Sequence, residues 1–141
     1  MTNQTINDLM TRDPVCLDAA CTVTEAARTM RDADIGPVIV TGAGDHELGI
    51  LTDRDIVTRV VADGRDPDSV TLGELATWDP TCVSPNDPVE RAITLMRGNA
   101  IRRLPVVEDG KPVGVISLGD LAIDRDPDSA LADISRATPN N

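Results

Sequence analysis

The chain has 141 residues and a mass of 15.0 kDa, and its 24 acidic against 13 basic residues give a formal net charge of −11 at neutral pH. Its content of 40% hydrophobic and 26% charged residues is typical of a globular chain, which at this length can bury one sizeable core. The negative charge, and a tryptophan as the one aromatic residue among Phe, Trp and Tyr, disfavour nucleic acid and anionic membrane surfaces as partners.

The first half of the chain alternates short apolar runs with stretches of helical spacing. A helical turn, a brief strand, a helix, a two-stranded hairpin and a second helix are predicted in that order, at Ile6–Met10, Val15–Leu17, from Thr22 onward, Val38–Thr41 with Leu48–Thr52, and Arg54–Ala62. Thr22 and Glu25 have the spacing of a capping box, which marks the start of the first long helix. Gly42 and Gly44 are typical turn residues for the hairpin.

The second half repeats the first. A shift of 66 residues superimposes identical residues, among them Thr5/Thr71, Asp13/Asp79, Pro14/Pro80, Cys16/Cys82, Val23/Val89 and Met30/Met96. After the hairpin loop the shift becomes 65 and aligns Gly49/Gly114 and Asp55/Asp120. The same elements are therefore predicted at Leu72–Ala76, Thr81–Val83, from Asp87 onward with Pro88 at the first helical position, Leu104–Val107 with Val113–Ser117, and Gly119–Ile123.

This order, β-α-β-β-α in each copy, predicts an α+β fold built from two small repeats. We expect the first repeat over residues 5–64, a linker over 65–71, the second repeat over 72–126, and a short helix with a disordered tail over 127–141. A unit this small leaves an apolar face exposed when alone. We therefore expect the two copies to pack about a pseudo-twofold axis and to be intertwined into one pair.

A motif of the form Gly-apolar-apolar-Thr/Ser-x-x-Asp closes the hairpin of both copies. In the first copy Gly49 allows a close backbone approach, and Thr52 ends a strand where a helix begins, so its hydroxyl and the N–H groups behind it suit a phosphate. Asp55, one helical turn later, can accept two hydrogen bonds from a ribose diol. The structural alternative is a capping box, in which Thr52 and Asp55 only start the helix. Gly114, Ser117 and Asp120 repeat the arrangement, and we interpret the pair as ligand sites.

The tandem β-α-β-β-α units, the segments GILTDRD and GVISLGD, and the intervening IRRLPVV resemble a pair of cystathionine-β-synthase-type (CBS) domains from about Ile6 to about Asp124. With no enzyme or transporter attached, the chain looks like a stand-alone CBS pair, also called a Bateman module. The resemblance implies that adenine nucleotides or related adenosyl ligands bind between the repeats. It also implies association of two chains into a disc of four repeats.

Carried over residue by residue, the resemblance implies two unequal sites. The first would combine Gly49, Thr52 and Asp55 with Arg102 and Arg103, which match positions of phosphate-contacting basic residues. Its adenine pocket would be lined by Thr81, Cys82 and Pro105. The second, weaker site would combine Gly114, Ser117 and Asp120 with Val15 and Cys16, beside Gly36, Pro37 and Ile39. There Gly36-Pro37 stands where the first site has its two arginines, so the second site lacks positive charge for a phosphate.

Three classes of function are compatible with these residues. The leading hypothesis is a regulatory or sensor homodimer without catalysis, which binds AMP, ADP, ATP, NAD or S-adenosylmethionine and acts on an unknown protein partner. The alternative is a ligand-free dimeric scaffold whose two sites are vestigial. An enzyme is disfavoured, because the sequence offers no nucleophile–base pair and no metal cluster.

The cysteines and the start of the chain bear on its compartment. Cys16, Cys21 and Cys82 have no CxxC spacing, which favours reduced thiols over a disulfide framework or a zinc site. No apolar run approaches the roughly 20 residues of a membrane span, and the opening residues do not form a signal peptide. We therefore expect a cytoplasmic protein. Trp78 has no assigned role: core, dimer face and nucleotide border all remain open.

Overall fold

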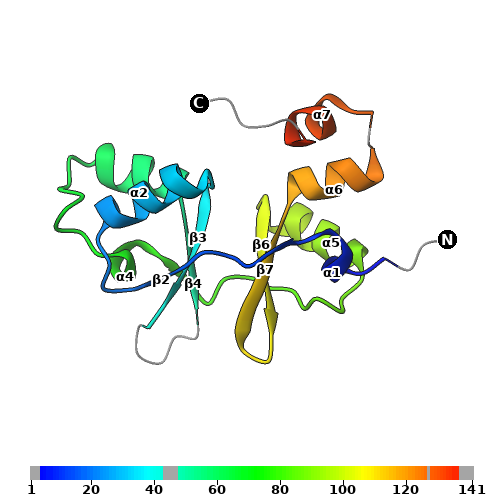
Figure 1. Ribbon diagram of the computed structural model, residues 1–141, viewed down its shortest axis with the longest axis horizontal. Helices are drawn as coiled ribbons and strands as arrows, with labels where there is room; N and C mark the ends of the chain where they lie inside the picture. Colours follow the sequence, from blue (N-terminus) through cyan, green and yellow to red (C-terminus); the bar gives the residue numbers. More distant parts are fainter. Residues whose placement is uncertain (1–3, 43–47, 127, 137–141) are drawn as a thin grey trace. The chain divides into compact units, whose positions relative to one another are not determined.

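The computed structural model describes residues 4–42, 48–126 and 128–136, so Gly44 of the predicted turn and the predicted tail at 137–141 lie outside the described residues. The chain forms two compact units, which we call unit 2, Val15–Pro80, and unit 1, Met1–Pro14 together with Thr81–Asn141 (Figure 1). Each unit thus combines the body of one sequence repeat with the opening segment of the other.

Unit 2 contains a four-stranded sheet with strand order β2-β3-β4-β5. Its elements are β2 Cys16–Asp18, α2 Val23–Ala33, β3 Pro37–Thr41, β4 Gly49–Thr52, α3 Asp53–Ile56, the π-helix η1 Val57–Val61, α4 Leu72–Leu75 and β5 Thr77–Trp78. Strands β2 and β3 are parallel, and the other pairs are antiparallel. The predicted helix at 54–62 is confirmed, but its second half widens into the π-helix η1.

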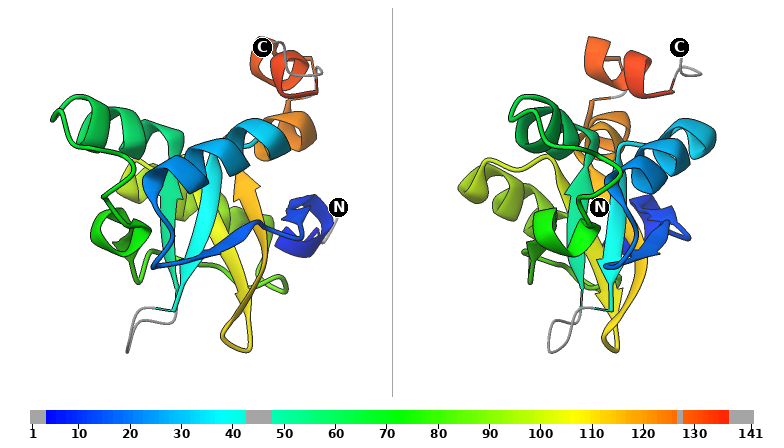
Figure 2. Two further views of the ribbon diagram at one scale, coloured as in Figure 1. Left: turned by 60° about the vertical axis from the view of Figure 1, so that its left-hand side comes forward. Right: turned by 90° about the vertical axis from the view of Figure 1, so that its left-hand side faces the viewer.

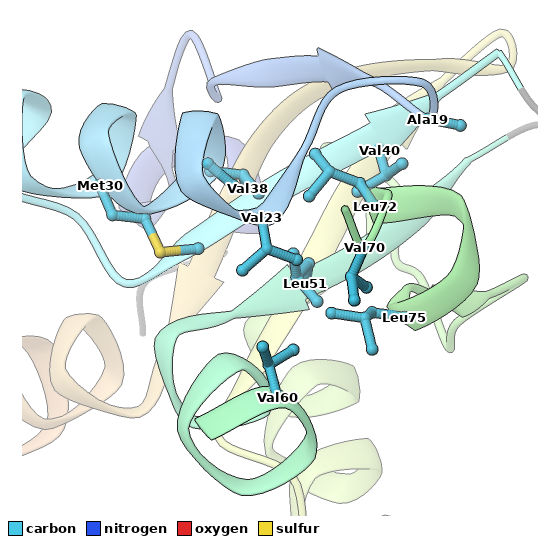
Figure 3. Close-up of a cluster of buried hydrophobic side chains, with 11 residues drawn as sticks. Ala19, Val23, Met30, Val38, Val40, Leu51, Val60, Val70, Leu72 and Leu75 are labelled. Carbon is cyan, nitrogen blue, oxygen red and sulfur yellow. The ribbon is translucent and has the colours of Figure 1, made fainter. Parts of the chain in front are cut away.

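The core of unit 2 fills the space between its helices and one face of its sheet. Aliphatic side chains from α2, β3, β4, η1 and α4 point toward one another, as Figure 3 shows for Val23, Val38, Leu51, Val60 and Leu75. All five are nearly or completely buried. The buried positions of α2 are Val23, Ala26 and Met30, which recur with helical spacing as the sequence predicts.

Unit 1 contains a three-stranded sheet with strand order β1-β7-β6. Its elements are α1 Ile6–Leu9, β1 Thr11–Arg12, α5 Val89–Asn99, β6 Arg103–Glu108, β7 Lys111–Ser117, α6 Leu118–Arg125 and α7 Ala130–Arg136. Figure 2 shows β6 and β7 running side by side into a tight turn. At that turn Asp109 and Gly110 have φ of 52° and 76°, the left-handed conformation that a type I′ hairpin requires.

The opening segment of each repeat completes the sheet that is formed by the body of the other repeat. Strand β1 pairs antiparallel with β7, where Thr11 aligns with Val115, and β5 pairs antiparallel with β4, where Ile50 aligns with Thr77. The helical turns that precede these strands also belong to the exchanged segments: Ile6 is fully buried in the core of unit 1, and Leu72 in the core of unit 2. Both cores therefore depend on residues from both sequence repeats.

Two predicted elements of the second repeat differ from the structure. The strand expected at Thr81–Val83 is reduced to one parallel bridge between Val83 and Val106. In the first repeat Ile39 donates its N–H to Val15 O at 2.8 Å, whereas its counterpart Pro105 has no N–H to donate, so the ladder cannot extend. The helix expected from Asp87 begins at Val89, and Pro88 is its N-cap residue instead of its first helical residue.

Candidate functional site

The repeated Thr/Ser-x-x-Asp motif forms a capping box in both units. At the start of α3 the Thr52 N–H and hydroxyl donate to Asp55 Oδ2 at 2.9 and 3.0 Å, and Asp55 N–H donates to Thr52 Oγ1 at 3.3 Å. At the start of α6 Ser117 N–H donates to Asp120 Oδ2 at 2.9 Å, and Asp120 N–H donates to Ser117 Oγ at 3.1 Å. The structural interpretation of the motif is therefore confirmed in each copy.

The capping boxes leave one oxygen of each carboxylate unused. Asp55 and Asp120 are both half-buried, and every hydrogen bond they accept from the described residues goes to Oδ2. Oδ1 can therefore accept hydrogen bonds from a ligand without breaking the cap. A carboxylate oxygen is a pure acceptor, which suits the hydroxyls of a sugar.

The N–H groups at the start of α3 are not open to a phosphate, so that expectation is wrong. Asp53 N–H donates to Gly36 O at 3.0 Å, and Arg54 N–H donates to Asp53 Oδ1 at 3.0 Å. Asp55 N–H is taken by Thr52, as described above. At the start of α6 Leu118 N–H likewise donates to Arg102 O at 2.8 Å. A phosphate at the start of α3 must therefore rely on side-chain cations.

The packing of the chain requires glycine at both motif positions, Gly49 and Gly114. A Cβ on Gly49 would lie 2.9 Å from Trp78 Cε3 and 3.1 Å from Thr77 O of the exchanged strand β5. A Cβ on Gly114 would lie 2.7 Å from Met10 Sδ and 2.8 Å from Thr11 O of β1. The close backbone approach predicted from Gly49 is therefore present, but the approaching backbone is that of the exchanged segment.

Trp78 is a packing residue of unit 2. Its indole is half-buried against the core, and Nε1 donates to Gly73 O at 3.1 Å. This contact links β5 to α4 and explains why the tryptophan faces Gly49.

Arg102 and Arg103 lie where β6 begins in unit 1. Arg102 is exposed and Arg103 half-buried, and neither forms an ion pair with the described residues. In the strand register Arg103 lies opposite Ser117. The two arginines thus supply uncompensated positive charge beside the capping box of their own unit, in a chain whose net charge is −11.

The expected adenine-pocket residues also belong to unit 1. Thr81 is exposed and Cys82 half-buried, while Pro105 is buried and accepts a hydrogen bond from Val83 N–H at 3.0 Å. Of the residues expected at the second site, Val15 and Cys16 belong to unit 2. Desolvation raises the pKa of the Cys16 thiol above its ordinary value, so this thiol stays protonated at neutral pH. Each expected site therefore takes residues from both units.

A groove on unit 1 was not anticipated from the sequence. It lies between α5 and α6 with a volume of about 610 Å³, and Ile93, Met96, Leu118 and Leu121 form part of its apolar lining. One feature of the sequence indicates this groove: an apolar residue, Leu118, begins helix α6 at the position where the first repeat has Asp53.

Among the described residues no group of three or more His, Cys, Asp or Glu is placed to hold a metal ion, and no described helix is long and apolar enough to span a bilayer.

Comparison with known proteins identifies the repeats. The CBS domain family model matches residues 6–62 and 72–123. Hypoxic response protein 1 of Mycobacterium tuberculosis is 36% identical over 118 residues, which cover 84% of this chain and 82% of that protein. A crystal structure of Hypoxic Response Protein I with two coordinated zinc ions has a TM-score of 0.73 and 37% identity, and the match covers 84% of this chain and 97% of that one.

Two further solved structures share the fold. The hexameric CBS-CP12 protein from bloom-forming cyanobacteria has a TM-score of 0.81 and 28% identity over 89% of this chain and 74% of that one. The CBS domain pair of protein MJ0100, solved with 5′-methylthioadenosine and S-adenosyl-L-methionine, has a TM-score of 0.75 over 86% of this chain and 94% of that one. At 21% identity the latter likeness shows the fold alone.

Proposed function

Because the chain belongs to the CBS domain family, with two such domains in tandem, we propose that it is a regulatory protein that binds an adenosine-containing ligand and has no catalytic activity. The observation that carries the proposal is the pair of Asp55 and Asp120 carboxylates, each with one oxygen left free by its capping box. The capping boxes of Asp8 and Glu74 use one carboxylate oxygen in the same way. What distinguishes Asp55 and Asp120 is that both follow a hairpin strand in the motif Gly-apolar-apolar-Thr/Ser-x-x-Asp.

The first proposed site combines groups from both units. Asp55 Oδ1 accepts hydrogen bonds from the ribose hydroxyls, and Thr52 holds that carboxylate in place. Arg102 and Arg103 neutralise the phosphates, because the N–H groups of α3 are already engaged. Thr81, Cys82 and Pro105 contact the adenine ring. Arginine is suited to phosphate binding, because its planar guanidinium group can donate two parallel hydrogen bonds to a phosphate.

The second proposed site is weaker for anions. Asp120 and Ser117 would face Val15 and Cys16, beside Gly36 and Pro37 where the first site has its arginines. Without a cation at those positions, a triphosphate has no partner for its charge. The second site is therefore suited to an adenosyl ligand of low negative charge, such as S-adenosylmethionine or 5′-methylthioadenosine, which the related MJ0100 pair holds.

The same family membership supports self-association. CBS-CP12 is hexameric, so chains of this family can assemble through their CBS domains or attached segments. We propose a homodimer as the regulatory unit, in which ligand binding changes the surface offered to a protein partner.

Thermal unfolding with and without ligand tests the proposal. AMP, ADP, ATP, NAD and S-adenosylmethionine should each be added at millimolar concentration, and at least one should raise the melting temperature. Asp55→Asn keeps an oxygen for the Thr52 cap but loses the second acceptor, so the dissociation constant of a phosphate-bearing ligand should rise about tenfold or more.

Asp120→Asn is the matched control, because Asp120 has the same place in the capping box of α6. It should leave the binding of a phosphate-bearing ligand unchanged. If no ligand stabilises the wild type, or if both variants weaken the same ligand equally, the proposed first site is wrong.

A ligand-free scaffold remains the second candidate. It is favoured by the completeness of both capping boxes, which gives the motif a full structural reason to exist. If it is correct, the double variant Asp55→Asn/Asp120→Asn should bind its protein partner as tightly as the wild type in the presence and absence of nucleotide.

A further inference from the structure

The groove between α5 and α6 of unit 1 (Figure 1) combines buried apolar side chains with exposed basic ones. In its lining Met96 and Leu121 are only 6% and 4% exposed, whereas Arg97 and Arg102 are exposed. The apolar surface therefore lies inside the hollow, and the arginines lie toward solvent. Its volume of about 610 Å³ falls within the range of roughly 300–1,000 Å³ that is usual for small-molecule sites.

The charged side chains of this groove are all of one sign. They are Arg97, Arg102 and Arg125, and none of the described lining residues is acidic, although the chain has 24 acidic and only 13 basic residues. Arg125 is neutralised by ion pairs with Glu90 and Asp124. Arg97 and Arg102 form no ion pair with the described residues. Two cations beside an apolar hollow are thus available to an anion.

The first repeat shows that the fold does not require these residues. The corresponding positions, with the second repeat named first, are Arg97/Arg31, Arg102/Gly36 and Leu118/Asp53. In the first repeat Arg31 is engaged by Asp32 at 2.8 Å, so none of these three positions carries an unpaired cation. The unpaired arginines and the apolar residue at the start of the last long helix are therefore features of the second repeat and not of the fold.

We propose that the α5–α6 groove binds a single-chain fatty carboxylate. The alkyl tail lies against Ile93, Met96 and Leu121 inside the hollow, which removes apolar surface of both partners from water. The carboxylate accepts charge-assisted hydrogen bonds from Arg97 and Arg102. The site goes beyond the proposed function, and of the residues proposed to hold a nucleotide it uses only Arg102.

The distribution of apolar surface favours a small amphiphile over a protein segment. A docked helix needs several apolar anchor positions along a groove. Leu118, at 41%, is the one exposed large hydrophobic residue among the described lining residues, so a broad apolar face is not present here. A neutral amphiphile would leave both arginines without a partner, and a cationic one would be repelled by them.

Calorimetric titration of the full chain tests the ligand class. Decanoate, kept below its micelle-forming concentration, should bind with one site per chain. Decanol and decyltrimethylammonium carry the same tail with a neutral or a cationic head, and acetate carries the same head without the tail. These three should each bind at least about tenfold more weakly, because each lacks one of the two complementary features. Equal affinity for decanoate and decyltrimethylammonium would overturn the proposal.

A pair of arginine variants tests the carboxylate contact. Arg97→Gln removes a charged donor and should raise the dissociation constant of decanoate about tenfold. Arg31→Gln is the matched control, since Arg31 has the same helical position in the first repeat but lies outside the groove. It should leave the dissociation constant unchanged. If the two variants weaken decanoate equally, or if neither does, the carboxylate does not bind at this groove and the proposal is wrong.

Leu118→Asp gives the groove the residue that the first repeat has at this position. An acid at the first residue of α6 is favourable for the helix, so the variant should stay folded. Its carboxylate repels that of the ligand, so decanoate should bind more weakly than to Leu118→Asn, which loses the apolar contact without gaining a charge. Wild-type affinity in both variants would place the ligand elsewhere.

The probes separate this site from the nucleotide site. A wild type that binds no decanoate overturns the groove site and leaves the melting shifts with nucleotides to be judged by themselves. A wild type that binds decanoate but is stabilised by none of the adenosine compounds keeps the groove site and loses the proposed function.

Discussion

Trp78 packs directly over Gly49: a Cβ on that glycine would lie 2.9 Å from the indole Cε3. Strand β5, which carries the tryptophan, comes from the opening segment of the second repeat, whereas Gly49 lies in the hairpin of the first. The missing side chain therefore makes room for an exchanged strand. The equivalent Gly114 does the same for Met10 and Thr11.

Gly49→Ala should destabilise the protein by about 1–3 kcal/mol, since the new methyl group also meets Thr77 O, a backbone atom that cannot swing away. Gly98→Ala is the matched control: nothing lies within 4 Å of its added Cβ, and alanine favours the helical conformation of α5. Urea denaturation of both variants measures the effect. An unchanged free energy of unfolding for Gly49→Ala would contradict the packing role.

Two alanines at the ends of the long helices should respond to glycine with opposite signs. Ala100 ends α5 with φ of 52°, a left-handed conformation in which a Cβ is strained, so Ala100→Gly should stabilise by about 1 kcal/mol. Ala33 is the last residue of the regular helix α2, so Ala33→Gly should destabilise by about 0.5–1 kcal/mol. Thermal melts of the two variants should shift in opposite directions, and a shared direction would contradict the assigned strain.

The Glu74 carboxylate should make stability depend on pH in the acid range. Hydrogen bonds from the Thr71 N–H and hydroxyl, and the charge of Arg65, hold the pKa of Glu74 below its usual value. A lowered pKa means that the contribution is present above the ordinary glutamate pKa of about 4.3 and is lost as pH falls through the folded-state value. The stability difference between the wild type and Glu74→Gln should therefore shrink below about pH 4. Chemical denaturation at pH 6 and pH 3 measures it, and a constant difference would contradict the assignment.

Arg59 should stabilise the exchanged helical turn of unit 2. Its Nη1 donates to Leu75 O at 2.7 Å, at the C-terminal end of α4. Arg59→Met removes this donor and should cost about 1 kcal/mol, because Leu75 O then loses its charged partner. Arg54→Met, on the preceding turn, is the control, since the Arg54 side chain donates no hydrogen bond to the described residues. Equal destabilisation of both variants would rule out the carbonyl contact as the cause.

Most of the fold could be predicted from local signals in the sequence. The two hairpins follow from alternating apolar residues and from turn residues such as Asp109-Gly110, and the long helices follow from the spacing of Val23, Ala26 and Met30. The strands β1 and β5 could not be predicted, because two-residue strands have no period of their own and exist only by pairing with β7 and β4. The strand predicted at Thr81–Val83 is reduced to a single bridge, because Pro105 in its partner strand β6 has no N–H to donate.

The candidate site could be predicted only in part, because some of its hydrogen bonds join segments that lie far apart in the sequence. The Thr52–Asp55 and Ser117–Asp120 spacings indicate both a cap and a ligand site, and the structure confirms the cap. That the N–H of Asp53 is taken by Gly36 O could not be inferred, because this bond joins segments 17 residues apart through tertiary packing. The shared use of Arg102, Thr81 and Asp55 for one ligand stays a prediction.

The two units differ in how they can form during synthesis. Unit 2 is one uninterrupted stretch, Val15–Pro80, so all of its strands are synthesised, and leave the ribosome, before those of the second half of the chain. Unit 1 needs Met1–Pro14 as well as Thr81 onward, so Ile6 and Met10 must wait until their partners α5 and β7 emerge. Closing such a long loop is slow compared with local contacts. We expect unit 2 to fold first in the cell, and the N-terminal segment to pack into the core of unit 1 last.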